Sequence, residues 1–594
     1  MSSSRCIVLK FTAYVDPLEN KIHSDLSIEN LMNHIQMICQ WPRESGSEGE
    51  KRAFDSIEKE LESLKLSVYR DEFDSFISLP EAGWLEIISP ESKKIEGLPP
   101  SFSTSTPEGG FTGELVYLGL GEDSDYAGKD VSGKILLIDG LPSPKAARRA
   151  EDFGAAGLIA AGDDHLHHMI ITPLWGTPTF SKKHLIPKIP CLCILRRDGD
   201  LLKEYLRNRP AIIQIRTKVW TGFKKIPVLT GDLRGRVEGE RFLLLSGHVD
   251  SWRFGAQDNA GANAAMLEIA RLLQKNRSGM RRGVKFAFWS GHSQGRYSGS
   301  TWYADHFWEE LYRNGIAHLN VDCIGAKGAT DYSNLFGTED TWDLTEKLIF
   351  DCTRQRVKAR HSPRAGDQSF WGVGLPSLFM DLSGVPPQNG PGKTTATASF
   401  IGMGGLPWWW HTKDDTLDKI DPEILALDTR IYLSSVLRLC NSPVLPFNEE
   451  TMGREILKRL KESDQVSKGL MDLSASVSAA KNFLRLAKKM NLAIDRQIDS
   501  RRSLSKLNRI NACLIKLSRN LIPLNYTSVG PFDHDLAIPI PPLPGLGSVS
   551  RLSQLNPQEE DFKFLKTELI RQQNRVVHLF NQCCEAIQEL GLEG

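Results

Sequence analysis

The chain has 594 residues, of which 25% are charged and 40% hydrophobic, and its 73 Lys and Arg residues balance 73 Asp and Glu residues. This length predicts several domains, because a single hydrophobic core does not grow to this size. The charge balance argues against nucleic acid or an anionic membrane as the main partner, although it leaves room for a local basic patch.

The N-terminal segment and the cysteines bear on where the protein works. Residues 1–20 hold a short apolar run interrupted by Lys10, which is too short and too polar for a secretory leader. No stretch approaches the roughly 18 apolar residues that a membrane span needs. The ten cysteines contain no CxxC pair and form no disulfide or zinc-ribbon pattern. We therefore expect a soluble, cytoplasmic protein that binds neither nucleic acid nor membrane.

Helical patterns open the chain and are followed by short strands. Residues 26–41 and 48–66 have helical periodicity, and the second segment is amphipathic, with apolar residues three and four positions apart at Phe54, Ile57, Leu61 and Leu64. From residue 79 the pattern changes to short apolar strands, a helix and many Pro and Gly turns. This order predicts a small α/β insertion that ends near residue 228.

The next part alternates buried strands with helices and then becomes entirely helical. Apolar strands at RFLLLSGH, VKFAFW and AHLNV are separated by expected helices at 260–275 and 298–313. This alternation predicts an α/β fold with a mixed, mostly parallel sheet flanked by helices. After residue 445 the strands disappear, and the helical patterns are broken only by the proline-rich residues 537–547, which we expect to be extended.

A set of histidines and acids lies where several of these strands end. His248 and Asp250 stand two apart at the end of one strand, Asp258 opens the next helix, Asp322 ends another strand, and His411 lies further along. His and carboxylate are ligands that zinc accepts, and successive βα turns deliver side chains to one crevice. A carboxylate can bridge two metal ions, and Asp250 is placed to orient the His248 imidazole.

The motifs around these residues resemble one peptidase family. These motifs are similar to the motifs of the co-catalytic zinc exopeptidases, a family that includes bacterial aminopeptidases, glutamate carboxypeptidase II and the transferrin receptor. In chain order the motifs are GHVDSW, DNAGA, FAFWSG with GSTWYA, NVD and WHTKDDTLDKID. The likeness extends over nearly the whole chain. It implies an N-terminal part of the peptidase domain (1–78), an inserted protease-associated or apical domain (79–228), a metallopeptidase-like domain (229–445) and a helical dimerisation domain (446–594).

The resemblance also implies a role for each position. His248, Asp258 and Asp322 would hold one metal ion, and Asp258 and His411 would hold the other, with Asp250 as the orienting acid. The cofactor would be one or two zinc ions or another divalent transition metal. Residues 366–370 resemble a substrate-facing segment, Trp410 falls at a pocket position, and the C-terminal domain would form a homodimer.

The chain departs from the family in one turn. Family enzymes carry two adjacent glutamates there, a general base and a ligand of the second metal, whereas this sequence has His292 and Ser293. Either His292 is the base, or His292 is a metal ligand, or the site is degenerate as in the receptor branch. Arg296 and Tyr297 follow in the same turn and are further candidate catalytic residues, with a cation and a phenol to offer. Arg296 could bind a substrate carboxylate or the oxyanion, although a structural ion pair is the favoured interpretation.

Other features allow simpler interpretations. Residues 163–169, DDHLHHM, suggest a metal cluster but are expected to form a solvated loop, and the three tryptophans at 408–410 could be core or could line a pocket. Residues 389–400 lack the spacing of a phosphate-binding loop. Asp367 could be catalytic or could cap a loop.

These observations favour a metal-dependent hydrolase of peptide or peptide-like amide bonds, most simply an exopeptidase of the aminopeptidase or carboxypeptidase type. A binding or scaffold protein similar to the transferrin receptor is the alternative, as is an amidohydrolase that acts on a non-peptide amide.

Overall fold

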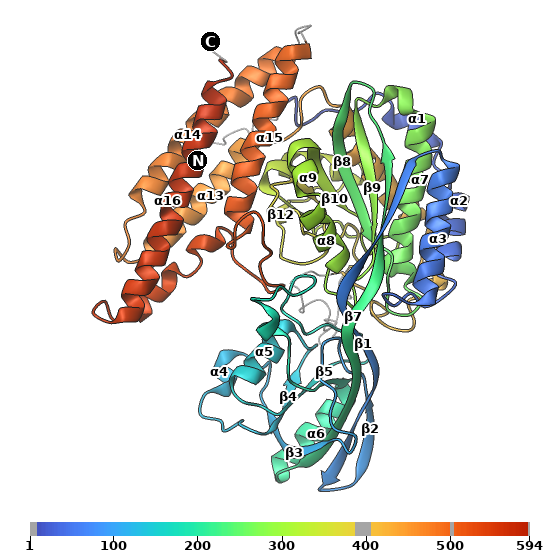
Figure 1. Ribbon diagram of the computed structural model, residues 1–594, viewed down its shortest axis with the longest axis vertical. Helices are drawn as coiled ribbons and strands as arrows, with labels where there is room; N and C mark the ends of the chain where they lie inside the picture. The colour runs from blue at the N-terminus through green and yellow to red at the C-terminus, as the bar shows by residue number, and fades with distance from the viewer. Residues whose placement is uncertain (1–8, 387–404, 499–503, 592–594) are drawn as a thin grey trace.

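The computed structural model describes residues 9–386, 405–498 and 504–591. It contains a body, an apical lobe below it and a group of C-terminal helices beside it (Figure 1). The segment 389–400, for which no phosphate-binding loop is expected, lies outside the described residues.

The body is built on a mixed sheet in which most neighbouring strands are parallel. Its strands follow the order β12-β11-β13-β10-β8-β9-β7, with β7 antiparallel to β9 and β11 antiparallel to β13. The strands confined to the body are β8 (Glu238–His248), β9 (Arg282–Trp289), β10 (Gly315–Asn320), β11 (Phe336–Gly337), β12 (Arg360–His361) and β13 (Ser377–Leu378). The predicted α/β fold with a mostly parallel sheet is confirmed.

Helices cover both faces of this sheet. Leu243 and Leu245 point to one face and Leu244 to the other, because successive side chains of a strand alternate. Figure 1 shows α2, α3 and α7 together on one side and α8 and α9 on the other. The helices of the body are α1 (Glu19–Ser24), α2 (Ile28–Ile38), α3 (Glu48–Ser63), α7 (Ala262–Lys275), α8 (Ser298–His306), α9 (Trp308–Asn314), α10 (Trp342–Thr353) and α12 (Pro422–Asn441).

Local sequence explains two of these helices directly. Ser47 caps α3 by accepting a hydrogen bond from the Glu50 backbone N–H, and the predicted apolar face is buried, apart from Leu64, which is only partly buried. Residues 298–313, expected to form one helix, form two, because the chain leaves helical geometry at Phe307.

Two long strands connect the body to the apical lobe. β1 (Ser67–Ser89) and β7 (Ile212–Leu233) pair antiparallel along nearly their whole length and run through both parts (Figure 1). The predicted boundaries at residues 78 and 228 fall inside these strands, so paired β structure joins the two parts. The boundaries themselves stay a prediction.

The apical lobe has a sheet of its own that continues from β7. Strands β3 to β6 are parallel to one another, as a small α/β unit requires. The elements of the lobe are β2 (Lys93–Gly97), β3 (Phe111–Tyr117), α4 (Asp123–Tyr126), β4 (Ile135–Asp139), α5 (Pro144–Asp152), β5 (Gly157–Asp163), β6 (Cys191–Leu195) and α6 (Arg196–Asn208).

The C-terminal region is helical, as predicted. Its helices are α13 (Glu449–Val466), α14 (Ser474–Ile498), α15 (Leu504–Tyr526) and α16 (Glu560–Gln588). The segment between α15 and α16 crosses to the rest of the molecule, where the Ala537 N–H donates to the Pro173 carbonyl in the apical lobe over 2.7 Å. The C-terminal region therefore contacts both other parts of the chain.

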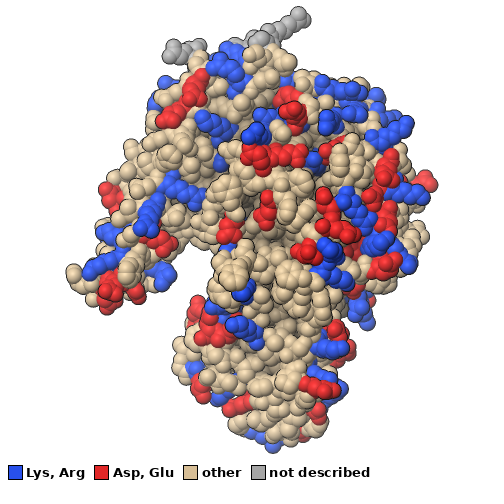
Figure 2. All heavy atoms as spheres, viewed as in Figure 1, with Lys and Arg blue, Asp and Glu red and all other residues tan. Residues whose placement is uncertain are grey.

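The surface matches the balanced composition. Figure 2 shows acidic and basic side chains interspersed over the visible face, without a large area of one sign. In the described parts of the chain, no helix combines the length and apolarity needed to cross a membrane.

Candidate metal centre

The five predicted residues around the metal site converge at the carboxyl edge of the body sheet. His248 ends β8, Asp250 and Asp258 lie between β8 and α7, and Asp322 follows β10. His411 comes from the segment that precedes α12. The carboxyl ends of parallel strands are where ligands bind in open α/β sheets, and the side chains of different turns meet there.

The donor atoms have the spacing that a zinc ion requires. His248 Nε2 lies 3.0 Å from Asp258 Oδ1 and 3.4 Å from Asp322 Oδ1, and His411 Nε2 lies 3.2 Å from Asp258 Oδ2. Two ligands of one tetrahedral zinc ion stand roughly 3.3 Å apart, given zinc–ligand bonds of about 2 Å. The two oxygens of Asp258 thus face two different histidines, as a carboxylate that bridges two ions would.

Several buried donor atoms of this cluster lack a hydrogen bond. His248 Nε2, Asp258 Oδ1 and Asp322 Oδ1 are fully buried and have no hydrogen-bond partner in the described residues. Buried polar groups are normally satisfied, so unpaired atoms that converge on one point mark the place of an ion. Three donors of this type fit a divalent cation, and the residues present therefore suit the metal that the sequence predicts.

The charges of the cluster depend on one another. Burial opposes the charged form of His248, yet Asp322 and Asp258 outweigh it and hold the pKa of His248 well above its usual value. Burial would raise the pKa of Asp258, but the neighbouring imidazoles of His248 and His411 hold it well below the usual range. The protein therefore keeps negative charge at Asp258, as a cation site requires.

Each of the three imidazoles in this region is held through its Nδ1 atom. Nδ1 of His248 lies 2.7 Å from the Asp250 carbonyl oxygen, and Nδ1 of His411 lies 2.7 Å from the His168 carbonyl oxygen. A carbonyl oxygen only accepts, so Nδ1 carries a proton in both rings and Nε2 is the nitrogen that faces the cluster. Nδ1 of His292 is held in the same way by the Asp367 carboxylate, 2.8 Å away.

Asp250 does not hold His248 in the manner that the sequence suggests. Its backbone carbonyl accepts from His248, whereas its carboxylate is 3.9 Å from that ring. The two carboxylate oxygens instead accept the backbone N–H groups of His292 (3.1 Å) and Ser293 (2.7 Å). The Ser45 hydroxyl donates to the same carboxylate over 3.1 Å. Asp250 therefore ties the variant turn to the strand that carries His248.

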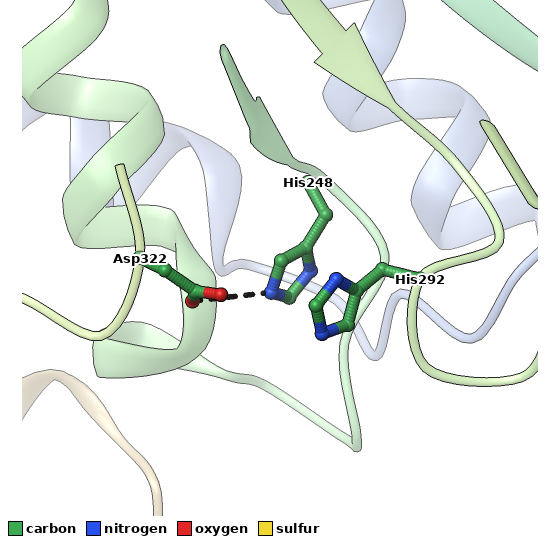
Figure 3. Close-up of side chains that lie close together, drawn as sticks. All are labelled: His248, His292 and Asp322. Carbon is green, nitrogen blue, oxygen red and sulfur yellow. Dashed lines mark ion pairs between the residues drawn. The ribbon is translucent and has the colours of Figure 1, made fainter. Parts of the chain in front are cut away.

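The variant turn places His292 against the cluster. The rings of His248 and His292 stack with centroids 3.8 Å apart and planes inclined by 12°, and Figure 3 shows them face to face with Asp322 beyond His248. Donor atoms of these three residues lie within 4.8 Å of one another. Asp367 is fully buried, and its second oxygen accepts from the Ser300 hydroxyl over 2.6 Å. Asp367 therefore orients His292 and is not a simple loop cap.

The stacking restricts how His292 can meet a metal. The lone pair of an imidazole nitrogen lies in the plane of its ring, so an ion bound by His248 lies in the His248 plane. The ring of His292 is stacked nearly parallel on the ring of His248 at 3.8 Å, so the lone pairs of His292 lie in a different plane from those of His248. The two rings as arranged cannot both bind one ion with good geometry, although His292 can face a water molecule or a second ion. Ser293 supplies no carboxylate there.

Arg296 and Tyr297 adjoin His292 in different ways. Tyr297 is buried, with its ring edge-on to His292 at 4.9 Å and packed on Trp175 of the apical lobe at 4.3 Å. Arg296 Nη2 donates to the Ala537 carbonyl over 3.3 Å, and the guanidinium forms no ion pair within the described ranges. The favoured structural ion pair of Arg296 is therefore not found there.

A cleft of about 510 Å³ lies over the cluster. Its walls come from all three parts of the molecule, including Met169 of the apical lobe, His292 and His411 of the body, and Ile538 of the C-terminal region. Four residues of its lining other than glycine have left-handed backbone geometry, namely Arg296, Tyr297, Cys323 and His411. Such geometry is costly for these residues and gathers at functional sites.

Most of the loop at 163–169 is buried or half-buried, contrary to the prediction, and only Asp164 is exposed. His167 is 0% exposed, and the His168 ring stacks on Trp252 of the body at 4.6 Å. The backbone N–H of His168 donates to the His411 carbonyl over 2.8 Å, and the His411 ring in turn donates to the His168 carbonyl. Two hydrogen bonds therefore join His168 and His411. Burial lowers the pKa of His168 to about 3, so this histidine is neutral. The loop positions a candidate metal ligand.

The three tryptophans before His411 divide between two roles. Trp409 is buried and donates from Nε1 to the Gln257 side chain over 2.9 Å. Trp410 lines the cleft and stacks on His411 at 3.5 Å, whereas Trp408 is partly exposed beside His165. Only Trp410 thus faces the site.

Sequence reasoning missed several acids and a thiol around the cluster. Asp415 accepts the backbone N–H groups of Gln257 and Asp258 over 2.9 and 3.0 Å, which fixes the loop before α7. Burial raises the pKa of Asp415 to about 7. Cys323 and Asp381 line the cleft. Cys323 follows Asp322 in the sequence and Asp415 lies within the motif that begins at Trp410, but no pattern points to Asp381.

The sheet thus gathers histidines and acids around a cleft at its carboxyl edge, which is the arrangement expected of a metal-dependent hydrolase. Residues 229–435, which form the central part of the body, match the model of peptidase family M28.

Individual relatives cover more of the chain. A protein described as a probable glutamate carboxypeptidase from Zea mays is 23% identical over 72% of this chain and 69% of its own length. An aminopeptidase of Bacillus subtilis is 25% identical over 65% of this chain and 78% of its own length. A human protein described as an inactive dipeptidase-like protein is 22% identical over 55% of this chain and 43% of its own length. The similar proteins thus include both peptidases and a protein described as inactive.

A solved structure shares the fold. A zinc aminopeptidase from Bacillus subtilis superposes with a TM-score of 0.52, at 21% identity, over 69% of this chain and 94% of that chain. At this identity the likeness establishes the fold, and the chemistry of the present chain depends on its own residues.

Proposed function

We propose that the protein is a metal-dependent exopeptidase that hydrolyses amide bonds of peptides or of small peptide-like molecules. One observation carries the proposal: His248, Asp258 and Asp322 meet with the spacing of zinc ligands, and their inward atoms lack other partners. The match to peptidase family M28 supports the reaction class.

Zinc is the proposed cofactor, as one or two ions. His248, Asp258 and Asp322 would hold the first ion, and Asp258 and His411 the second. When bound, such an ion polarises the scissile carbonyl and lowers the pKa of a water molecule. Two nitrogens with carboxylate oxygens also suit other divalent transition metals, so the metal preference is part of the test.

His292 takes the place of the missing glutamate base in this proposal. Its Nδ1 is bound to Asp367, which leaves Nε2 as the nitrogen that can accept the proton of the attacking water and return it to the leaving amine. The buried Asp367 carboxylate stabilises the protonated ring between these two steps. The N–H bonds of the turn to Asp250 keep His292 in place.

The experiment combines kinetics with metal analysis. The wild type, reconstituted with zinc or manganese, is assayed on aminoacyl anilides, on peptides with free carboxyl termini and on simple acyl amides. We expect turnover with bound metal, and a His292→Gln variant that keeps its metal but loses at least about 100-fold in kcat. A His292→Gln variant that loses one ion assigns His292 as a ligand instead of the base. A wild type that binds no transition metal contradicts the proposal.

A non-catalytic binding protein is the second candidate. The replacement of both glutamates by His292 and Ser293 favours it, because the Ser293 hydroxyl is buried and offers neither a base nor a strong metal ligand. If it is correct, His248→Ala leaves the biological activity unchanged. A hydrolase loses that activity with the same substitution.

A homodimer and a cytoplasmic location complete the proposal. On α16, Phe564 is 67% and Ile570 45% exposed, and burial of such apolar surface between two copies would be favourable. Cys583 and Cys584, further along the same helix, are both free, as in reducing compartments. Sedimentation of the wild type and of a Phe564→Asp variant tests the dimer, and fractionation of cells tests the location.

A further inference from the structure

Asp381 lies in the wall of the cleft and has no role in the proposed reaction. It follows β13 and lines the same cleft as Asp322 and His292. Its Oδ1 is buried and has no hydrogen-bond partner among residues 9–386, 405–498 and 504–591. This oxygen requires an explanation although Asp381 as a whole is only partly buried, because a buried polar atom without a partner is costly.

The surroundings of Asp381 make this cost larger. The charge of Asp322 acts on Asp381 with the same sign, and Met380, Cys323 and Leu406 line the cleft with it. Burial, followed by the charge of Asp322, raises the pKa of Asp381 to about 7. A nearby cation is the partner that would relieve both effects.

Asp381 does not belong to the groups of candidate metal ligands. The two groups of potential ligand atoms that lie within 4.8 Å of one another are His248 with His292 and Asp322, and Asp258 with Asp322 and Cys323. Asp381 belongs to neither group. It is therefore placed to meet a cation that sits beside the centre and arrives with the substrate.

A peptide carries such a cation next to its first amide bond. The α-ammonium group is separated from the carbonyl carbon of the N-terminal residue only by Cα, so a carbonyl at the centre brings the ammonium within a few ångströms of it. We propose that Asp381 binds the α-ammonium group of the substrate, so that the enzyme is an aminopeptidase. This inference rests on the proposed function and names the end of the peptide that the site recognises.

The geometry favours an amine over a carboxylate at this position. A substrate carboxylate would face the side chains of two acids, Asp322 and Asp381, and would be repelled by their charge. An ammonium group would instead donate charge-assisted hydrogen bonds to the carboxylates of Asp322 and Asp381. Such bonds are among the strongest in proteins. Arg296 and Arg364 lie elsewhere in the lining, where their guanidinium groups bind main-chain carbonyls of Ala537 and Asp535.

The test compares substrates that differ only in the charge of the amine. Leucine anilide and N-acetyl-leucine anilide are assayed with metal-loaded wild type, with Asp381→Asn and with Asp381→Glu. We expect the wild type to prefer the free amine, and Asp381→Asn to raise KM for it by about 10-fold to 100-fold with kcat changed less than about threefold. Asp381→Glu should recover part of the affinity. Asp130→Asn, on an exposed side chain of the apical lobe, is the matched control.

Binding and metal content separate this inference from the proposed function. Leucinamide and N-acetyl-leucinamide are titrated calorimetrically into the same proteins, which requires no turnover. If the wild type binds metal but cleaves neither anilide, the proposed function is contradicted. The role of Asp381 is still supported in that case if leucinamide binds more tightly than N-acetyl-leucinamide and this difference is lost in Asp381→Asn. Equal binding of both amides, an equal effect of Asp381→Asn on both, or loss of metal from Asp381→Asn overturns the inference.

Discussion

His292 Nδ1 lies 2.8 Å from Asp367 Oδ2, and Asp367 is 0% exposed. The imidazole that replaces a glutamate is thus held by a carboxylate from a different segment, between β12 and β13. Burial alone would raise the pKa of Asp367, but His292, with smaller contributions from His248 and Ser300, lowers it below the usual value, so Asp367 is charged. The pair has the arrangement of a base with its orienting acid.

Asp367→Asn tests this pair. The amide keeps the size of the side chain but removes the charge that stabilises the protonated ring and fixes its orientation. We expect kcat to fall by about 10-fold to 100-fold, while KM and bound metal stay nearly unchanged. Steady-state kinetics and elemental analysis check this. Ser300→Ala, which removes only the hydroxyl that donates to Asp367, should have the smaller effect, and an unchanged kcat in Asp367→Asn would refute the role.

The bridging position of Asp258 predicts unequal losses of metal. Its two oxygens face His248 and His411 separately. We therefore expect His248→Ala and His411→Ala each to lose one ion and Asp258→Ala to lose both, as measured by elemental analysis after dialysis. His306→Ala changes an exposed histidine of α8 and should keep the wild-type content. Equal losses in all three site variants would indicate a single ion.

Removal of the metal should destabilise the protein. Without a cation the site holds the acids Asp258 and Asp322 in a buried cluster, with donor atoms that have no other partner. A metal at 100 times its dissociation constant stabilises the fold by about 2.7 kcal/mol. We expect a chelator to lower Tm and zinc to restore it, as followed by calorimetry. The His248→Ala variant should show a smaller response, and an identical response would place the stabilising ion elsewhere.

The sequence was sufficient to predict the convergence of the ligands. His248 and Asp322 each stand at the end of an apolar segment, and parallel strands bring such ends together without further information. Asp258 and His411 were candidates from the sequence as well, but their assignment to particular metal ions depended on the family resemblance. The alternation of strands and helices likewise predicted the sheet and the helical C-terminal region.

The remaining features depend on contacts between distant segments. The polar residues at 163–169 have the composition of a solvated loop, but Trp252 and His411, which are remote in sequence, bury them. The carbonyl of Asp250, rather than its carboxylate, holds His248, and no residue pattern encodes a main-chain acceptor. Asp381 is remote from every motif and joins the cleft only through the fold.

Asp428 provides a test of stability against pH away from the metal ligands. It accepts hydrogen bonds from Tyr332, Ser383 and the Gly325 N–H, but burial outweighs them and raises its pKa from 3.8 to about 6. Because the folded pKa is the higher one, the unfolded chain ionises first as pH rises from about 4 to 6. About two pH units at about 1.4 kcal/mol each predict a loss of about 3 kcal/mol. Asp428→Asn cannot ionise, so wild type should lose stability relative to this variant over that range in denaturant titrations. The control variant Asp130→Asn should show the same pH dependence of stability as the wild type. A difference in the free energy of unfolding between wild type and Asp428→Asn that stays constant from pH 4 to 7 would contradict the prediction.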